Sequence, residues 1–312
     1  MASALAPVRR NGDSAAMIVR DRPRLPELLF ALRGSIVPLI APGVIALMLI
    51  AAAMVWVHQR FALFPVVDGI GFTVFGVALS LFLGFRNNAA YDRWWEARKL
   101  WGGLLADMRS FAREVDIFVP DETLRATLLN GALAFLHLHR ANLRGLTDDA
   151  VARELGGALA DAAHPPNAAL DALTARIADA RRAGLIDGFG ALSLGQRIAS
   201  MSLQQAGCER IAATPLPYVY SLLVYRTTYL YCLLLPLALI GPVGWMTPVF
   251  AGIVAYVFLG FAEVSEELSH PFGVTQNGLP LDAICRAAEI SIAPHLGKTP
   301  PEPLAAVDYF LS

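Results

Sequence analysis

The stretch Gly84–Gly102, with the sequence GFRNNAAYDRWWEARKLWG, joins an apolar segment to a polar one without a proline or a turn signal. Tryptophan and arginine are common where a membrane helix meets water, so an interfacial belt would explain part of this pattern. A simple anchor does not need the two asparagines beside Arg86, however. The stretch therefore indicates a membrane helix that continues past the bilayer surface into a polar region.

The chain outside this stretch has the composition of an integral membrane protein. Of its 312 residues, 56% are hydrophobic and 16% are charged, whereas soluble domains carry about 25% charged residues. The apolar residues gather in four segments, and the 21 residues of the first would cross the roughly 30 Å core of a bilayer. The third contains Arg226, which needs water or a partner at such a depth. The four expected segments are Val37–Val57, Val66–Phe85, Leu216–Leu239 and Trp245–Ala262.

Basic residues near the segment ends predict the orientation, because lysine and arginine stay on the cytoplasmic side. The N-terminal arm and the stretch after the second segment are rich in arginine, whereas the loop 58–65 holds only Arg60. We therefore expect both termini in the cytoplasm. The expected organisation is a partly disordered cytosolic arm (1–25), segments one and two (26–86), a cytosolic helical region (87–213), segments three and four (214–265) and a cytosolic C-terminal segment (266–312).

The middle region reads as helices, with no alternating strand pattern of useful length. Residues Pro120 to Thr123 mark a helix start, and Leu124, Leu128 and Phe135 follow on one face. A second helix is expected after Asn167, with Leu170, Leu173 and Ile177 on its apolar face and Gly184 just past its end.

Several classes of function find no support in the composition. The net charge is −1 and there are no long charged runs, so the sequence shows no basic region of the kind that binds nucleic acid. Cys208, Cys232 and Cys285 lie far apart and are expected to be buried thiols. An enzyme could use His137 and His139, but residues two apart on a helix face different ways. No catalytic or phosphate-binding motif is present, and we expect no cofactor and no metal site.

Three blocks of the chain together resemble the bestrophin family in its prokaryotic branch, in order and in spacing, over about residues 20–295. The first block is the opening stretch. The second comprises residues 206–211 and 214–218, AGCERI and TPLPY, and the third comprises Glu263, Glu266, Glu267 and Leu268 followed by residues 270–273, HPFG.

The resemblance implies an all-α membrane protein with four transmembrane helices per subunit, assembled as a homopentamer around one central pore. It places the pore neck on the second membrane helix, at Val77, Leu81 and Phe85. Residues four apart share one face of a helix, so five copies would form three stacked apolar rings. Such rings gate by excluding water. A second, cytosolic constriction is expected between Leu192 and Ile198, with Leu194 and Ile198 as candidates.

The resemblance also bears on the ions. Animal members carry a run of acidic residues after the Pro-Phe-Gly element, whereas residues 274–278 here read VTQNG, with no carboxylate before Asp282. Calcium prefers several carboxylate oxygens, so we expect no calcium gating. The prokaryotic branch implies monovalent cations such as sodium. A chloride channel of the same family stays open, because the neck rings carry no charge. A transporter or a non-conducting scaffold is a weaker alternative, since no inverted repeat is evident.

Overall fold

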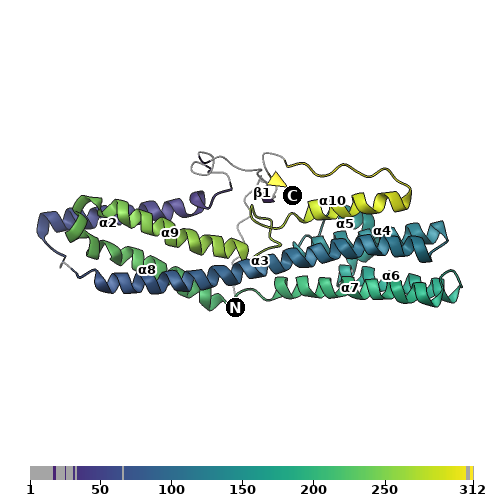
Figure 1. Ribbon diagram of the computed structural model, residues 1–312. Helices are drawn as coiled ribbons and strands as arrows, with labels where there is room; N and C mark the ends of the chain where they lie inside the picture. The colour runs from purple at the N-terminus through teal and green to yellow at the C-terminus, as the bar shows by residue number, and fades with distance from the viewer. Residues whose placement is uncertain are drawn as a thin grey trace. The chain divides into compact units, whose positions relative to one another are not determined.

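The computed structural model describes residues 17–18, 25, 31, 34–64, 67–306 and 310–311 (Figure 1). Most of the expected arm 1–25 and the first residue of the expected second segment, Val66, lie outside the described residues. Helices account for nearly everything else. The described chain divides into two compact units, and α3 (Ile70–Phe118) and α7 (Gly188–Ala213) each contribute to both. Helix α3 does not break at residue 86, where the sequence analysis placed the end of the membrane segments.

The first unit, here called the membrane unit, comprises the described residues of Asp21–Leu104 and Met201–Pro271. Besides parts of α3 and α7, it holds α2 (Val37–Phe61), α8 (Tyr218–Val243), the 3₁₀ helix η2 (Gly244–Met246) and α9 (Thr247–Leu268). In the described chain, three stretches are long and apolar enough to span a membrane: Val37–Phe61, Ile70–Phe118 and Tyr218–Leu268. The last contains both α8 and α9, which separate at Gly244 (φ 53°), so each of the four expected segments has its own helix.

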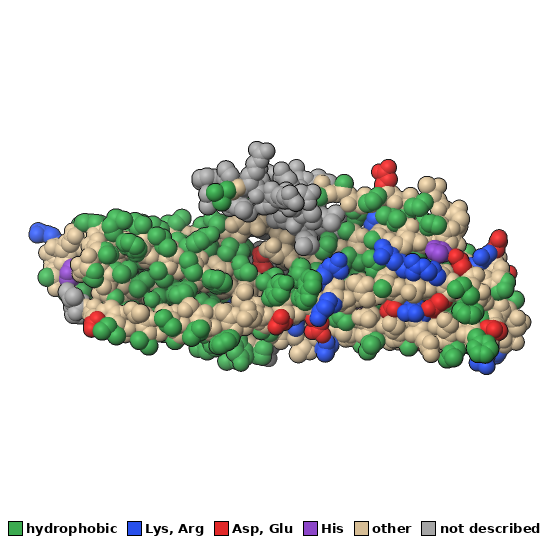
Figure 2. All heavy atoms as spheres, viewed as in Figure 1, with side chains coloured by type: hydrophobic (Ala, Val, Ile, Leu, Met, Phe, Trp, Pro, Cys, Tyr) green, Lys and Arg blue, Asp and Glu red, His purple; other side chains and the backbone are tan. Residues whose placement is uncertain are grey.

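The core of the membrane unit forms where α3, α8, α9 and α2 meet. Leu79 and Leu83 of α3 pack with Tyr231 of α8 and Leu259 of α9. Gly76 makes this approach possible, because a Cβ atom there would lie 2.6 Å from the Tyr231 hydroxyl oxygen. The outer surface remains apolar, and Figure 2 shows hydrophobic side chains over the visible faces of these helices.

The second unit, here called the polar unit, comprises the described residues of Leu105–Ser200 and Phe272–Ser312, together with strand β1. Strands β1 (Met17–Ile18) and β2 (Phe310–Leu311) pair antiparallel, a small departure from the all-α expectation. The remaining elements are α4 (Glu122–Leu143), α5 (Ala150–Gly156), η1 (Gly157–Asp161), α6 (Pro165–Arg182), α10 (Leu281–Ile292) and η3 (Ala293–Leu296).

The two helices expected in the middle of the chain are confirmed as α4 and α6. Asp121 caps α4, and its carboxylate accepts a hydrogen bond from the backbone N–H of Leu124 at 2.6 Å. Leu170, Leu173 and Ile177 are buried on α6, and Gly184 follows its end with φ 74°. Local patterns were sufficient here, because each helix carries its own cap and its own apolar stripe.

Ion pairs hold the helices of the polar unit together. Arg140 of α4 donates to Asp282 of α10 at 2.6 Å, and Arg144 donates to the other oxygen of the same carboxylate at 2.7 Å. His137 bonds Glu289 at 2.8 Å, and this hydrogen bond lowers the pKa of the Glu289 carboxyl. His139, two positions on, instead stacks against Phe135. The two histidines therefore serve different contacts.

The three cysteines are free and buried, as predicted. Burial raises the pKa of the Cys208 thiol to about 12, and burial also raises the pKa of Cys285. A thiol that holds its proton so firmly is a poor nucleophile and a poor metal ligand.

Candidate pore-lining face

An uncovered line of apolar side chains runs along the first part of α3. Val77, Leu81 and Phe85, the neck residues expected from the sequence, are 56%, 59% and 71% exposed in the single chain. Ile70 and Val74 extend the same line toward the start of the helix and are also exposed. These five positions are spaced three or four apart, so they lie on one face. We call them the neck face.

The other side of α3 is fixed by the core of the membrane unit. Phe75 meets the ring of Tyr231 edge-on, with 5.4 Å between the ring centroids. Leu79 and Leu83 are fully enclosed between α3, α8 and α9. Because this side of α3 is packed against α8 and α9, the rotation of the helix is fixed. The neck face, on the opposite side, therefore points away from the rest of its own chain.

Polar side chains beside the neck face have internal partners. The Ser80 hydroxyl donates to the Val77 carbonyl at 2.9 Å, and the Thr73 hydroxyl donates to the Gly69 carbonyl at 3.1 Å. Such bonds to the preceding turn use the hydroxyl hydrogen within the helix. The face therefore behaves as an apolar surface along its length.

An ion pair with a buried arginine follows the neck face directly. Arg86, next to Phe85, is almost completely buried and donates to the Glu266 carboxylate at 2.5 Å and to the Ser221 hydroxyl at 2.9 Å. Its other terminal nitrogen is 3.4 Å from the Ala262 carbonyl oxygen. One guanidinium thus ties α3 to both α8 and α9. Because a buried charge needs its partner, this pair fixes the rotation of α3 where the neck face ends.

The three sequence blocks that carry the family resemblance meet around this pair. Asn87 accepts a hydrogen bond from Ser265 of α9 at 3.4 Å. Arg93 donates to the carbonyls of Ser269 at 2.7 Å and Thr214 at 2.6 Å. The contacts join residues more than a hundred positions apart, so no local pattern could have paired them. The residues themselves were visible in the sequence only as parts of the three blocks.

The residues expected at the cytosolic constriction lie on the covered side of α7. Leu194 is 0% exposed and Ile198 is 8% exposed, so both are buried within the single chain. They belong to a buried stripe of α7 that also includes Met201. The three- and four-residue spacing of this stripe is visible in the sequence and predicts that it is buried. On α7, Phe189 and Leu192 are uncovered, at 78% and 60% exposure.

The described part of the chain contains no group of three or more histidine, cysteine, aspartate or glutamate residues arranged to hold a metal ion. Asp282, the first carboxylate after the Pro-Phe-Gly element, is engaged by Arg140 and Arg144.

Comparison with known proteins agrees with this architecture. Residues 17–294 match the family described as bacterial/fungal bestrophin protein. A voltage-dependent anion channel-forming protein of Mesorhizobium japonicum is 44% identical over 311 residues, which cover 98% of this chain and all of that protein. The voltage-dependent anion channel-forming protein YneE of Escherichia coli K12 is 37% identical over 289 residues, 88% of this chain and 93% of YneE.

Solved structures lead to the same family. A bacterial bestrophin homologue from Klebsiella pneumoniae superimposes with a TM-score of 0.76 at 30% identity, covering 82% of this chain and 97% of that chain. The chain therefore belongs to the bestrophin family, and the resemblance drawn from the sequence is confirmed. The names of the relatives point to anions, not to the sodium ions that we expected.

Proposed function

We propose that this chain is one subunit of a homopentameric, ion-conducting pore in the bacterial inner membrane. The observation that carries the proposal is the neck face, a line of large apolar residues left uncovered on a helix whose other side is anchored. A single chain cannot enclose a water-filled path with four membrane helices. A closed ring uses the same contact between successive copies and brings one neck face per subunit to the axis. Helices α2, α3, α8 and α9 would each cross the bilayer, with both termini in the cytoplasm.

The neck would work as a hydrophobic gate. Val77, Leu81 and Phe85 would form three successive rings, and a constriction of this kind stops ions when it loses its water. For the second constriction the same proposal favours Leu192, which lies within the expected range 192–198, or Phe189 just before it. These α7 side chains are uncovered, while Leu194 and Ile198 are buried.

Monovalent anions such as chloride are the first candidate for the permeant ion, because the relatives are named as anion channel-forming proteins. The rings themselves carry no charge that would select an ion.

Monovalent cations are the second candidate, and one observation favours them. Asp92 lies two helical turns beyond Phe85, at about the same angle around α3. It is exposed, and it takes part in no hydrogen bond or ion pair within the described chain. Five such carboxylates below the neck would attract cations. Replacing Asp92 by Asn should shift the reversal potential toward that of anions if cations permeate, and should change it little if anions do.

We further propose that calcium does not gate the pore. A calcium site needs several oxygen ligands free to coordinate, and the Asp282 carboxylate already receives two arginine side chains.

The pore is tested by measuring ion flux into lipid vesicles that contain the Leu81→Ala protein and comparing it with flux through the parent protein. Shortening Leu81 widens one ring at five points, so water should enter more easily and flux should rise while the fold survives. Leu79→Ala is the matched control, because Leu79 lies two residues away but in the core. It should lose stability without gaining flux. Native mass measurement should give five copies; a monomer or dimer, or an unchanged flux in stable Leu81→Ala protein, contradicts the proposal.

A further inference from the structure

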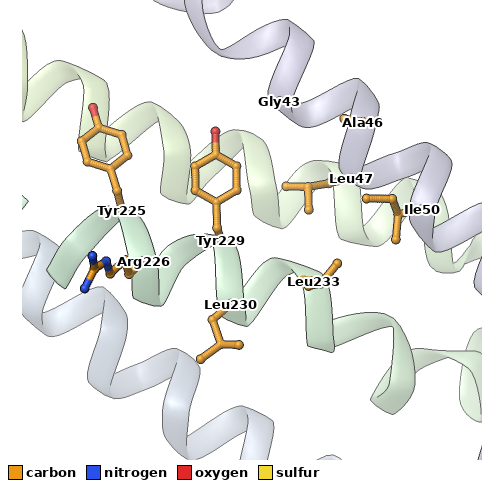
Figure 3. Close-up of a pocket in the computed structure, with 9 residues that line it drawn as sticks. All are labelled: Gly43, Ala46, Leu47, Ile50, Tyr225, Arg226, Tyr229, Leu230 and Leu233. Carbon is orange, nitrogen blue, oxygen red and sulfur yellow. The ribbon is translucent and has the colours of Figure 1, made fainter. Parts of the chain in front are cut away.

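A groove runs between α2 and α8 on the surface of the membrane unit, with a volume of about 570 Å³ (Figure 3). A space of this size is typical of ligand pockets. Gly43, Ala46 and Ile50 line it from α2, and Tyr229 and Leu233 line it from α8. Gly43 keeps the groove open, because even a Cβ atom at that position would lie 3.2 Å from the Tyr229 hydroxyl oxygen.

The surface of the groove is almost entirely apolar, and Arg226 is the one charged residue among the described residues that line it. Arg226 lies at one end in Figure 3, while Ile50 and Leu233 lie toward the other. Arg226 and Tyr229 are three residues apart on α8, so they share a face. Within the described chain, neither the Arg226 guanidinium nor the Tyr229 hydroxyl has a hydrogen-bond or ion-pair partner. An apolar groove is thus bordered by two donors that lack an acceptor within the described chain.

The depth of Arg226 makes a missing partner expensive. It lies eight residues after the start of α8, or about 12 Å along the helix, inside an apolar span. A cation at such a depth needs a counter-charge or must reach the interface with its long side chain. Gly43 lies six residues after the start of α2. The end of the groove at Arg226 is therefore in the leaflet that surrounds the N-terminal ends of both helices.

We propose that this groove binds one anionic phospholipid per subunit. Arg226 pairs with the headgroup phosphate, the Tyr229 hydroxyl donates to the same headgroup, and an acyl chain lies along Gly43, Ala46 and Ile50. The assignment to a lipid rests on charge complementarity, because an apolar floor that ends in an unpaired cation matches a molecule with an acyl chain and an anion. The headgroup charge would supply the partner that Arg226 lacks within its own chain.

Lipid binding to purified, delipidated protein tests the site. Phosphatidylglycerol and phosphatidylcholine with identical acyl chains are titrated separately, bound lipids are counted by native mass spectrometry, and the thermal midpoint is recorded. We expect one tightly bound phosphatidylglycerol per subunit and a raised midpoint, with weaker binding of phosphatidylcholine. Arg226→Gln should weaken phosphatidylglycerol binding by roughly tenfold or more, as the loss of a charged hydrogen bond requires.

Two further variants keep the test specific. Arg60→Gln removes the same charge in the last turn of α2, away from the groove, and should bind phosphatidylglycerol like the parent. Ala46→Phe fills the apolar part of the groove and should weaken both lipids while Arg226 stays in place.

Three results overturn the proposal: unchanged binding in Arg226→Gln, equal losses in Arg226→Gln and Arg60→Gln, or equal affinity for the two lipids. The proposal would also be wrong if Arg226→Gln dissociated the oligomer while each subunit still bound the same number of lipids. That result would indicate that the groove is part of a subunit interface. The readout is bound lipid, not conduction, so failure here leaves the proposed pore intact.

Discussion

The first half of α3, up to Phe85, and its second half, from Trp101 onward, both carry large apolar residues at helical spacing, and they use them in opposite ways. Val77, Leu81 and Phe85 are uncovered in the single chain, whereas Trp101, Leu104, Met108, Phe111 and Val115 are completely buried. Nothing in the residue types alone separates these sets. The difference arises because the second half is enclosed by helices of its own chain and the neck face is not.

The comparison shows how one continuous helix can serve two surroundings. A soluble protein rarely leaves a long apolar line uncovered, so the neck face requires surroundings that the single chain lacks, which the proposed ring of subunits would supply. The second half is stabilised by burial within its own chain, as in an ordinary soluble core. Arg86 lies where the first pattern ends, and its buried contacts to α8 and α9 mark the change.

Arg86→Met would test this boundary and should have the largest effect. The substitution removes the hydrogen bonds of one buried guanidinium to Glu266, Ser221 and Ala262 at once. The three contacts together should cost about 3–5 kcal/mol, although the partly exposed Glu266 carboxylate contributes less than a buried one would. The yield of assembled protein and the thermal midpoint should both fall sharply. Arg98→Met, at an exposed position on the same helix, is the control and should have little effect. Replacing Arg86 and Glu266 together by Met should recover part of the lost stability. Equal losses in Arg86→Met and Arg98→Met would show that Arg86 has no special role where the neck face ends.

The same truncation in the two halves sharpens the comparison further. Leu104→Ala should cost about 2–5 kcal/mol, because it leaves a cavity in a filled core. Leu81→Ala should cost far less, since no neighbour within its own chain encloses the side chain. Thermal unfolding of both purified variants in the same detergent measures the difference. Equal losses would place Leu81 in a packed environment and take it off the neck face.

The pH dependence of stability tests whether water is excluded from the interior of the polar unit, where His139 is completely buried. Burial lowers its pKa to about 3, and repulsion from His164 adds to the effect. The folded imidazole therefore stays neutral while the unfolded chain takes up a proton below pH 6.5. Stability should fall as the pH decreases from 6.5 toward 3, by about 2 kcal/mol at pH 5. His139→Phe should flatten this part of the pH profile; an unaltered profile would mean that water reaches the ring.

The smallest effect is expected from an exposed ion pair in the polar unit. Arg182 and Asp179 pair across one turn near the end of α6, and both side chains are largely exposed. Because water screens such a pair, Arg182→Ala should change stability by less than about 0.5 kcal/mol. Chemical denaturation of Arg182→Ala and Arg86→Met, each compared with the parent, measures the two losses of stability. A loss as large as that of the buried pair would show that exposure in the single chain is a poor guide to the environment in the assembly.

The sequence was informative where a signal is local. The cap at Asp121, the stripe Leu170–Ile177 and the apolar segments each lie within one helix, so spacing and residue type were enough. The neck positions came from the family resemblance, and the structure places them on one uncovered face.

The rest depends on contacts between distant parts of the chain. The partner of Arg86 lies 180 positions away, and no periodicity connects the two. Leu194 and Ile198 are as apolar as any residue that lines a constriction, and only the packing around α7 decides that they are buried while Phe189 and Leu192 are not. The permeant ion cannot follow from neck residues that carry no charge.

The unbroken course of α3 between Phe85 and Trp101 also sets a rule for its length. Each residue advances the helix by about 100°, so the direction of the neck face and the direction of the buried Trp101 and Leu104, in the same unit, are fixed relative to each other. One inserted or deleted residue between these points would swing Val77, Leu81 and Phe85 by more than a quarter of a turn, although no residue had been replaced. Only changes near a whole number of turns, such as seven residues, would keep the register. The number of residues in this stretch therefore matters to the packing of α3 as much as their identity does.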